Sequence, residues 1–255
     1  MPFTLAAGRS IEYQWLEGAE PALVFLHEGL GSIAQWRDFP MRVATATGCR
    51  ALLYNRYGYG NSEILQEDKA GVRFMHREAF EFLPQLLSNF SVKNPVLVGH
   101  SDGASIALIY AGSGHPVRGL AVLAPHVFTE EAGLNSIAKA KHQFESTDLP
   151  QRLGKYHQDP RKTFYLWNDA WLDPGFRRWN IEAYLPGIRC PVLAIQGEDD
   201  EYGSMAQLDA IKRQVGGPCE LLKLENCGHA PHRDQPERVL SALSNFIRQI
   251  DGANP

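Results

Sequence analysis

The sequence predicts an α/β fold in which a mostly parallel sheet of eight strands is flanked by helices. Short apolar segments recur along the chain with helical patterns between most of them, which is the order of elements in parallel sheets. Most of these segments are continuous apolar runs, as in strands that are buried on both faces. The 255 residues, of which 44% are hydrophobic and 21% charged, fit one large globular domain or one domain with an insertion.

The elements can be placed in order from these patterns. Residues 11–16 alternate in the manner of an antiparallel strand. Continuous buried strands are expected over residues 22–26, 51–54, 96–98, 119–123, 192–195 and 220–224. A small apolar helix is expected over residues 104–111. An amphipathic helix is expected over 236–250, followed by a frayed tail over 251–255.

The alternation of strands and helices is interrupted between residues 128 and 187. Helical patterns cover residues 130–147 and 160–171, no strand is expected, and large aromatic side chains are frequent. We expect residues 128–187 to form a helical cap inserted into a core domain of residues 1–127 and 188–255. Such a cap would lie above the carboxyl ends of the strands, where ligands of open α/β sheets bind.

Composition and charge restrict the class of partner. The net charge of −4 is spread without long runs of either sign, so a small molecule is expected as the partner, with no nucleic acid and no membrane. No apolar stretch approaches the roughly 18 residues of a membrane span, and the N-terminus lacks a basic leader. A cytoplasmic monomer or homodimer is therefore expected. The four cysteines have no C-x-x-C spacing and are expected to be reduced thiols, with neither a metal site nor a cofactor.

The most informative segment is residues 96–105, which read as a buried strand, a G-x-S-x-G turn and the start of a helix. In such a turn the serine adopts a strained backbone conformation, and the flanking glycines let the strand and the helix approach each other. Ser101 is therefore the candidate nucleophile. A structural turn that merely contains serine is the alternative, and the strand and helix patterns on either side favour the catalytic interpretation.

A serine hydroxyl is a poor nucleophile near neutral pH, so a histidine must accept its proton and a carboxylate must orient that histidine. His229 is the first histidine in the loop after the last expected strand, where the base belongs. The order serine, acid, histidine is the order found in α/β-hydrolases. With these motifs the chain resembles the α/β-hydrolase superfamily over nearly its whole length, in particular its capped esterases and carbon–carbon bond hydrolases.

The resemblance implies the position of the acid. In the family the acid usually follows the penultimate strand in a G-x-x-D turn, which here begins at Gly197 and places the acid at Asp200. Asp199 is the alternative within this run of four carboxylates. The other two, Glu198 and Glu201, are expected to be solvated.

The resemblance also implies an oxyanion hole made of two backbone amides. One belongs to Asp102, the residue after the serine. The other belongs to Gly29, in a loop that matches the family's H-G-x-x-G, with Leu30 as the alternative. Glu28 replaces the usual glycine of this loop, where an unusual backbone conformation would cost glutamate about 1 kcal/mol or more, so either the loop follows a different path or Glu28 has a role. Glu28 is expected to anchor the loop, or else to face a polar group of the substrate.

Contacts to the substrate are expected from the cap and from the strand ends. The aromatic cap predicts an apolar or aromatic ligand, and the possible contacts are Glu28, Leu30, His126, Trp167, Trp171 and Tyr202. The carboxylate of Asp102 disfavours an anionic acyl group unless the cap supplies Arg177 or Arg178. The turn over residues 55–62 resembles the family's D-x-R-G-x-G-x-S turn and is expected to serve the fold alone.

Two further histidines are expected to be structural. His100 lies within the elbow, at a position where the family often has histidine as a packing residue. His232 is the second histidine of the family's G-H-x-x-H pattern, and a hydrogen-bonding role beside the loop is expected for it.

The sequence thus predicts a serine hydrolase that cleaves a small apolar or aromatic carboxylic ester through an acyl-enzyme, with Ser101, His229 and Asp200 as its triad. Hydrolysis of a carbon–carbon bond in a ring-cleavage product by the same triad is the alternative. A ligand receptor on a hydrolase scaffold is a further one, which the complete triad disfavours. Dehalogenase and epoxide-hydrolase chemistry needs a carboxylate nucleophile, which Ser101 excludes.

Overall fold

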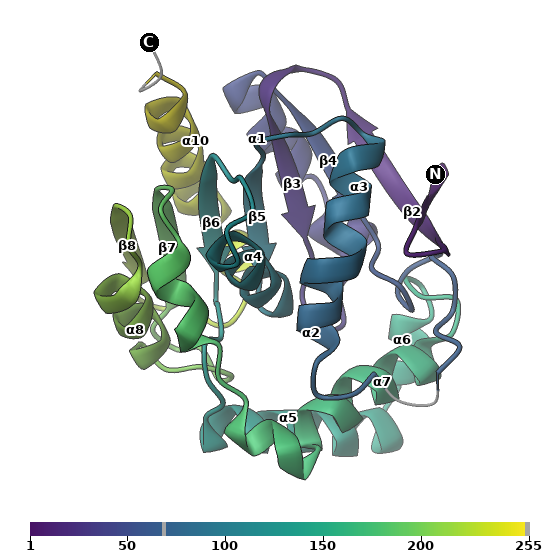
Figure 1. Cartoon of the computed structure of the whole chain (residues 1–255). Helices are drawn as coiled ribbons and strands as arrows, with labels where there is room; N and C mark the ends of the chain where they lie inside the picture. Colours follow the sequence, from purple (N-terminus) through teal and green to yellow (C-terminus); the bar gives the residue numbers. More distant parts are fainter. Residues whose placement is uncertain (68–69, 253–255) are drawn as a thin grey trace.

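A sheet of eight strands runs through the centre of the computed structural model, which describes residues 1–67 and 70–252 (Figure 1). Its strand order is β1-β2-β4-β3-β5-β6-β7-β8. Strand β2 pairs antiparallel with β1 and β4, and all other neighbours pair in parallel. This confirms the predicted, mostly parallel sheet. The strands are β1 (Phe3–Ala6), β2 (Arg9–Leu16), β3 (Ala19–Leu26), β4 (Cys49–Tyr54), β5 (Val96–His100), β6 (Gly119–Leu123), β7 (Val192–Gly197) and β8 (Cys219–Leu224).

Helices cover both faces of the sheet (Figure 1). Helices α1 and α10 pack against each other on one face, and α2, α3, α4 and α8 bury their apolar side chains on the other. A π-helical turn, η2 (Glu78–Phe82), joins α2 to α3. The helices around the sheet are η1 (Ile33–Trp36), α1 (Phe39–Thr47), α2 (Phe74–Arg77), α3 (Leu83–Asn89), α4 (Asp102–Gly112), α8 (Ala206–Gln214), α9 (Pro231–Asp234) and α10 (Pro236–Gly252).

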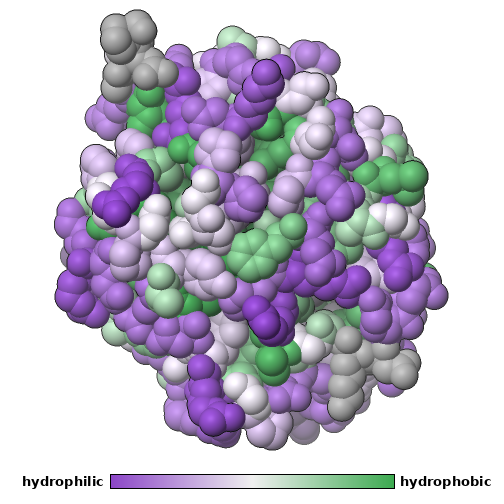
Figure 2. Space-filling model, viewed as in Figure 1, coloured by the Kyte–Doolittle hydropathy of each residue, from purple (hydrophilic) through white to green (hydrophobic). Residues whose placement is uncertain are grey.

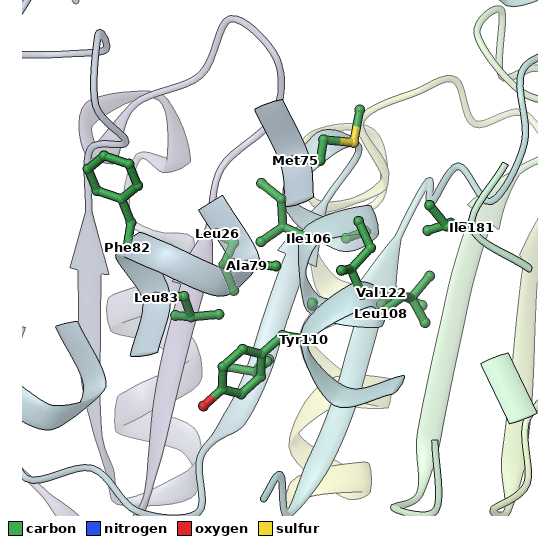
Figure 3. Close-up of a cluster of buried hydrophobic side chains, with 14 of the residues drawn as sticks. Leu26, Met75, Ala79, Phe82, Leu83, Ile106, Leu108, Tyr110, Val122 and Ile181 are labelled. Carbon is green, nitrogen blue, oxygen red and sulfur yellow. The ribbon is translucent and has the colours of Figure 1, made fainter. Parts of the chain in front are cut away.

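The continuous apolar strands follow from this two-sided cover. In β3, Phe25 belongs to the buried cluster under α1 and α10, whereas the next residue, Leu26, belongs to the cluster under α4. Because successive side chains of a strand point to opposite faces, a strand can be apolar throughout only where both faces are covered. Figure 3 shows the second cluster, in which side chains of the sheet, of α4 and of the α2–α3 segment meet.

A run of helices follows β6 and lies across one end of the sheet (Figure 1). Phe144 of α5 stacks on Phe164 of α7 with ring centroids 3.9 Å apart, so these two helices pack through aromatic side chains. Strand pairing in this part is limited to an isolated bridge between Phe128 and Asn180. The division of the chain at residues 127 and 188 stays a prediction. The run comprises α5 (Glu131–Ser146), α6 (Leu149–Leu153), α7 (Pro160–Leu172), η3 (Pro174–Arg178) and η4 (Glu182–Gly187).

The structure differs from the sequence-based expectations mainly at the ends of the chain. The prediction omits β1, an edge strand in which Phe3 and Leu5 are 51% and 69% exposed, because such a strand has no buried apolar run to reveal it. Helix α10 continues to Gly252, into the predicted frayed tail, and the rest of that tail lies outside the described residues.

The surface is mixed in character. On the face shown in Figure 2, hydrophilic residues predominate and hydrophobic residues form small separate groups. Within residues 1–67 and 70–252, none of the helices combines the length and the apolar composition that crossing a membrane requires.

Candidate active site

Ser101 lies in the sharp turn between β5 and α4. Its φ of 53° and ψ of −117° are outside the regions that non-glycine residues favour. The turn is held by its surroundings, since the Ser101 N–H donates to the carbonyl of Leu123 on β6 at 2.9 Å. Gly103 packs so closely on the carbonyl of Leu26 that a Cβ there would overlap backbone atoms. The strained turn therefore persists and leaves the Ser101 side chain at the edge of the sheet.

Two loops bring a histidine and a carboxylate to Ser101. His229, in the loop after β8, places its Nε2 2.9 Å from Ser101 Oγ. Asp200, in the turn after β7, places its Oδ1 2.8 Å from His229 Nδ1. With Nδ1 donating to the carboxylate, Nε2 is left to accept from the hydroxyl. Asp200 also accepts from the Tyr202 N–H at 2.9 Å and from Gln196 Nε2 at 3.1 Å.

Electrostatics favours an ionised acid beside this histidine. Burial lowers the pKa of His229, but the hydrogen bond and the charge of Asp200 outweigh burial and raise it above 6.5. Burial likewise raises the pKa of Asp200, but the hydrogen bond and charge of His229 hold it below its usual value. The neighbouring Glu198, Asp199 and Glu201 are exposed, so of this run it is Asp200 that contacts the histidine.

A cavity of about 120 Å³ opens beside Ser101. It brings together the predicted triad histidine, both residues predicted to supply oxyanion amides and all six side chains predicted as possible substrate contacts. The lining consists of Glu28, Gly29, Leu30, Ser101, Asp102, His126, Ile137, Trp167, Trp171, Tyr202 and His229. The prediction omits Ile137 of α5, because an apolar residue at a helical spacing reads like any core residue.

Backbone amides at this cavity are without partners. Among the described residues, the N–H groups of Gly29, Leu30 and Asp102 donate to no other protein group. Gly29 is packed against the indole of Trp167, so that a Cβ there would overlap the ring. Buried amides that lack a partner are rare in folded proteins, so these three are candidates for binding an oxygen of a ligand.

Glu28 has no positive φ, so its loop avoids the unusual backbone conformation that would be costly for glutamate. Its carboxylate accepts from Arg233 at 2.9 Å and lies 3.4 Å from His100 Nδ1. Burial raises the pKa of Glu28, but the hydrogen bond and charge of His100 and the charge of Arg233 hold it well below its usual value. Glu28 thus ties its loop to α9 and to the end of β5.

The carboxylate of Asp102 is fully buried at the start of α4. Trp171 Nε1 donates to its Oδ1 at 3.2 Å, and Arg56 Nη2 lies 3.8 Å from its Oδ2. Burial raises the pKa of Asp102 to about 6, although the charge of Arg56 opposes this. The turn over residues 55–62, which the sequence suggested serves the fold, thus also brings Arg56 to Asp102.

The arginines that the sequence suggested for accommodating an anionic acyl group lie away from the cavity. Arg177 forms a surface ion pair with Glu131, and Arg178 is exposed. Both follow α7 in the η3 segment, whose buried side chain is that of Phe176. Neither arginine is placed to supply the positive charge that an anionic acyl group would need, and the arginine beside Asp102 is instead Arg56, in the turn after β4.

Three further histidines lie near the site and differ in their contacts. His126 lines the cavity, and burial, together with the nearby His229, lowers its pKa to about 4, so the ring is neutral. His100 Nε2 donates to the carbonyl of His229 at 2.7 Å and so supports the loop of that residue. The ring of His232 packs on that of Trp36 with centroids 4.7 Å apart, and neither of its nitrogens has a hydrogen-bond partner among the residues that the structure describes. The hydrogen-bonding role predicted for His232 is wrong.

Among residues 1–67 and 70–252, no group of three or more His, Cys, Asp or Glu side chains is placed to hold a metal ion. The cysteine thiols are unpaired, with Cys49 and Cys227 buried and Cys190 and Cys219 partly exposed.

A sequence profile of the alpha/beta hydrolase family matches residues 23–242, which include the turn of Ser101 and the loops of Asp200 and His229. The chain is an α/β hydrolase. In sequence, this α/β hydrolase is 24% identical to the 2-succinyl-6-hydroxy-2,4-cyclohexadiene-1-carboxylate synthase of Salmonella typhimurium strain LT2, over 89% of this chain and 94% of that protein.

Solved structures share the architecture of this α/β hydrolase. A carboxylesterase of Nitrososphaera gargenis superimposes with a TM-score of 0.79 at 17% identity, covering 98% of this chain and 99% of that chain. A meta-cleavage product hydrolase of Pseudomonas fluorescens IP01 superimposes with a TM-score of 0.72 at 15% identity, covering 98% of both chains. At these identities the similarities show a common fold, and function has to be argued from the site.

Proposed function

We propose that this α/β hydrolase cleaves a small, apolar or aromatic carboxylic ester through an acyl-enzyme intermediate. The observation that carries the proposal is the uninterrupted hydrogen-bond series from Asp200 Oδ1 to His229 Nδ1 at 2.8 Å and from His229 Nε2 to Ser101 Oγ at 2.9 Å. This series ends at a cavity with unpartnered amides, which is the combination that acyl transfer requires.

In the acylation step, Ser101 Oγ forms a bond to the carbonyl carbon of the ester as its proton passes to His229 Nε2. The electron pair of the carbonyl π bond moves onto the oxygen, which becomes an oxyanion. When that pair returns, the bond from carbon to the alcohol oxygen breaks, and His229 gives its proton to the leaving alcohol. Asp200 keeps Nδ1 protonated throughout and stabilises the imidazolium.

Deacylation repeats the sequence with water as the nucleophile. His229 Nε2 accepts a proton from the water as its oxygen bonds to the acyl carbon, and a second oxyanion forms. Its collapse breaks the bond from carbon to Ser101 Oγ, and His229 returns the proton to that oxygen. The carboxylic acid is released and the starting state of the site is restored.

The amides of Gly29 and Asp102 are proposed to bind the oxyanion of both intermediates, with Leu30 as the alternative to Gly29. Both proposed donors lack a protein partner and line the cavity beside Ser101. Loss of one such donor typically lowers the rate by about 10²- to 10³-fold, so they are a major part of the proposed catalysis.

The cavity supports a small acyl group. Its volume is about 120 Å³. An apolar cavity of about 150 Å³ holds benzene, so the slightly smaller cavity here suits a small group. Leu30, Ile137, Trp167, Trp171 and Tyr202 supply most of its apolar wall. Two acidic residues, Asp102 and Glu28, are among those that line the cavity, so we propose an uncharged acyl group.

Hydrolysis of a carbon–carbon bond is a second candidate, because the same three side chains could serve it. The observation in its favour is the fold shared with the meta-cleavage product hydrolase. The two candidates differ in substrate, since a vinylogous diketone from ring cleavage would be turned over by the second and aryl esters by the first.

A set of p-nitrophenyl esters of increasing acyl length tests the proposal. We expect the acetyl to butanoyl esters to be the best substrates and the octanoyl ester to be poor, because the cavity holds a short chain. Ser101→Ala should abolish turnover of all of them and also labelling by a fluorophosphonate. Undiminished hydrolysis by Ser101→Ala would overturn the mechanism, and labelling of the wild type without turnover of any ester would point to a receptor.

A further inference from the structure

Arg56 is a buried arginine that the steps above do not use. It lies in the turn that follows β4, and its side chain is 3% exposed. Its backbone N–H donates to His27 Nε2 at 3.1 Å, and its Nη2 donates to the carbonyl oxygen of Glu28 at 2.8 Å. The Tyr59 ring lies beside it, with its centroid 4.4 Å from the Arg56 Cζ. The guanidinium is therefore held in one place rather than free in solvent.

The Glu28 carbonyl and the Gly29 N–H belong to one peptide unit. Since this unit is planar and trans, the direction of its carbonyl determines the opposite direction of its N–H. Arg56 Nη2 donates to this carbonyl, and His27 Nδ1 does so as well, each at 2.8 Å. A charged donor on the carbonyl also polarises the peptide, which strengthens the N–H as a donor. Arg56 thus both aims and strengthens the proposed Gly29 donor.

The same guanidinium faces Asp102, whose N–H is the other proposed donor. Its Nη2 lies 3.8 Å from Asp102 Oδ2, an atom that is buried and has no hydrogen-bond partner within the described residues. An isolated buried carboxylate is strongly destabilising, so Arg56, together with the Trp171 Nε1 that donates to the other oxygen, makes aspartate tolerable here. One cation therefore connects two segments of chain that each contribute a proposed oxyanion donor.

We propose that Arg56 is a positioning residue of the oxyanion hole. It fixes the position of the Glu28–Gly29 peptide unit relative to Asp102, so that both proposed amide donors point to the same place. The inference rests on the proposed function. Arg56 contacts the carbonyl of the Glu28–Gly29 peptide unit and the carboxylate of Asp102, and it is not among the residues that line the cavity, so it acts through these two groups. Its loss should raise the energy of the oxyanion while leaving binding of the uncharged ester nearly unchanged.

The decisive variant is the double substitution Arg56→Met with Asp102→Asn. Arg56→Met alone would leave the Asp102 charge buried without a partner, which endangers folding. The double variant removes both charges and keeps similar side-chain volumes. We expect kcat for a p-nitrophenyl ester to fall by about 10²-fold with KM nearly unchanged, as for displaced catalytic groups. Affinity for a boronic acid, which forms a tetrahedral adduct with the serine, should fall by a comparable factor.

Three comparisons make the result specific. Asp102→Asn alone keeps the hydrogen bond from Arg56 to the Glu28 carbonyl, so it should lose less than tenfold in kcat. Arg56→Lys keeps the positive charge, but an ammonium group lacks the planar array of N–H donors that a guanidinium has. The kcat of this variant should therefore lie between those of the wild type and the double variant. Arg118→Met removes an arginine that pairs with Asp251 at the surface, and it should retain wild-type kcat and boronic acid affinity.

Wild-type kcat and boronic acid affinity in the double variant would overturn the inference. So would a loss in Asp102→Asn alone as large as in the double variant, or a loss that only follows the fraction of folded protein measured by circular dichroism. Ser101→Ala separates this failure from that of the proposed function. If Ser101→Ala still hydrolyses the ester, the proposed function fails. If it is inactive and the double variant is fully active, only the role of Arg56 fails.

Discussion

The indole of Trp171 donates a hydrogen bond from Nε1 to Oδ1 of Asp102 at 3.2 Å, which joins α7 to the residue that follows the proposed nucleophile. Trp171 also packs on Phe176, with ring centroids 4.5 Å apart. Because the Asp102 carboxylate has one hydrogen-bond donor and one more distant guanidinium, it depends on each of them. Helix α7 therefore stabilises the elbow as well as lining the cavity.

Trp171→Phe should destabilise the protein by about 1.5–3 kcal/mol at pH 8, because a hydrogen bond to a charged group is lost in a buried place. Urea unfolding followed by tryptophan fluorescence measures this change. Trp179→Phe is the matched control, since the Trp179 Nε1 is buried and has no hydrogen-bond partner in the described part of the chain, so this substitution removes no such hydrogen bond. Equal destabilisation by the two substitutions would show that the hydrogen bond to Asp102 contributes little.

Asp200→Asn should lower kcat for a short aryl ester by about 10⁴-fold, because the amide leaves His229 in the wrong tautomer and its cation unstabilised. Asp199→Asn is the control, since Asp199 is exposed and His229 contacts Asp200 instead. Steady-state kinetics of the two variants shows which of the two aspartates is the acid of the triad. If kcat falls more in Asp199→Asn than in Asp200→Asn, the acid is Asp199, the alternative that the sequence left open.

The pH dependence of activity should follow the protonation of His229. Its pKa is raised above 6.5, with the hydrogen bond and charge of Asp200 outweighing burial, and only the neutral ring can accept the serine proton. We expect kcat/KM to rise with pH through a pKa above 6.5 and then to level off. In Asp200→Asn the residual activity should rise at a lower pH, because the charge that favoured the imidazolium is gone. If the activity of Asp200→Asn rises at the same pH as that of the wild type, the assignment of this pKa to His229 is contradicted.

Glu78 should make the protein less stable at high pH. Burial raises its pKa from 4.5 to about 7, so between these values the native state binds more protons than the unfolded state, and stability falls as pH rises. Glu78→Gln should therefore be neutral at pH 4 and stabilising by about 3 kcal/mol at pH 8. The amide oxygen can still accept from Tyr54 Oη, which lies 2.9 Å from Glu78 Oε1. Unfolding curves at both pH values test this, and a pH-independent difference would contradict it.

Much of this architecture could be predicted because its signals are local. A strand buried on both faces must be apolar throughout, and an elbow that brings a strand onto a helix needs glycine at Gly99 and Gly103, where a Cβ would overlap backbone atoms. The edge strand β1 could not be found in this way, since half-exposed residues carry no such signal.

The sequence by itself determined the fold, the candidate nucleophile and the loops in which its partners should lie, because each depends on short patterns of apolar residues, glycine and chain order. Only the tertiary structure decided which charged group meets which. Arg56, in a turn that reads as purely structural, reaches Asp102, while Arg177 and Arg178 point to the surface. Such pairings depend on how distant segments pack, and side chains many residues apart in the chain leave no common pattern in it.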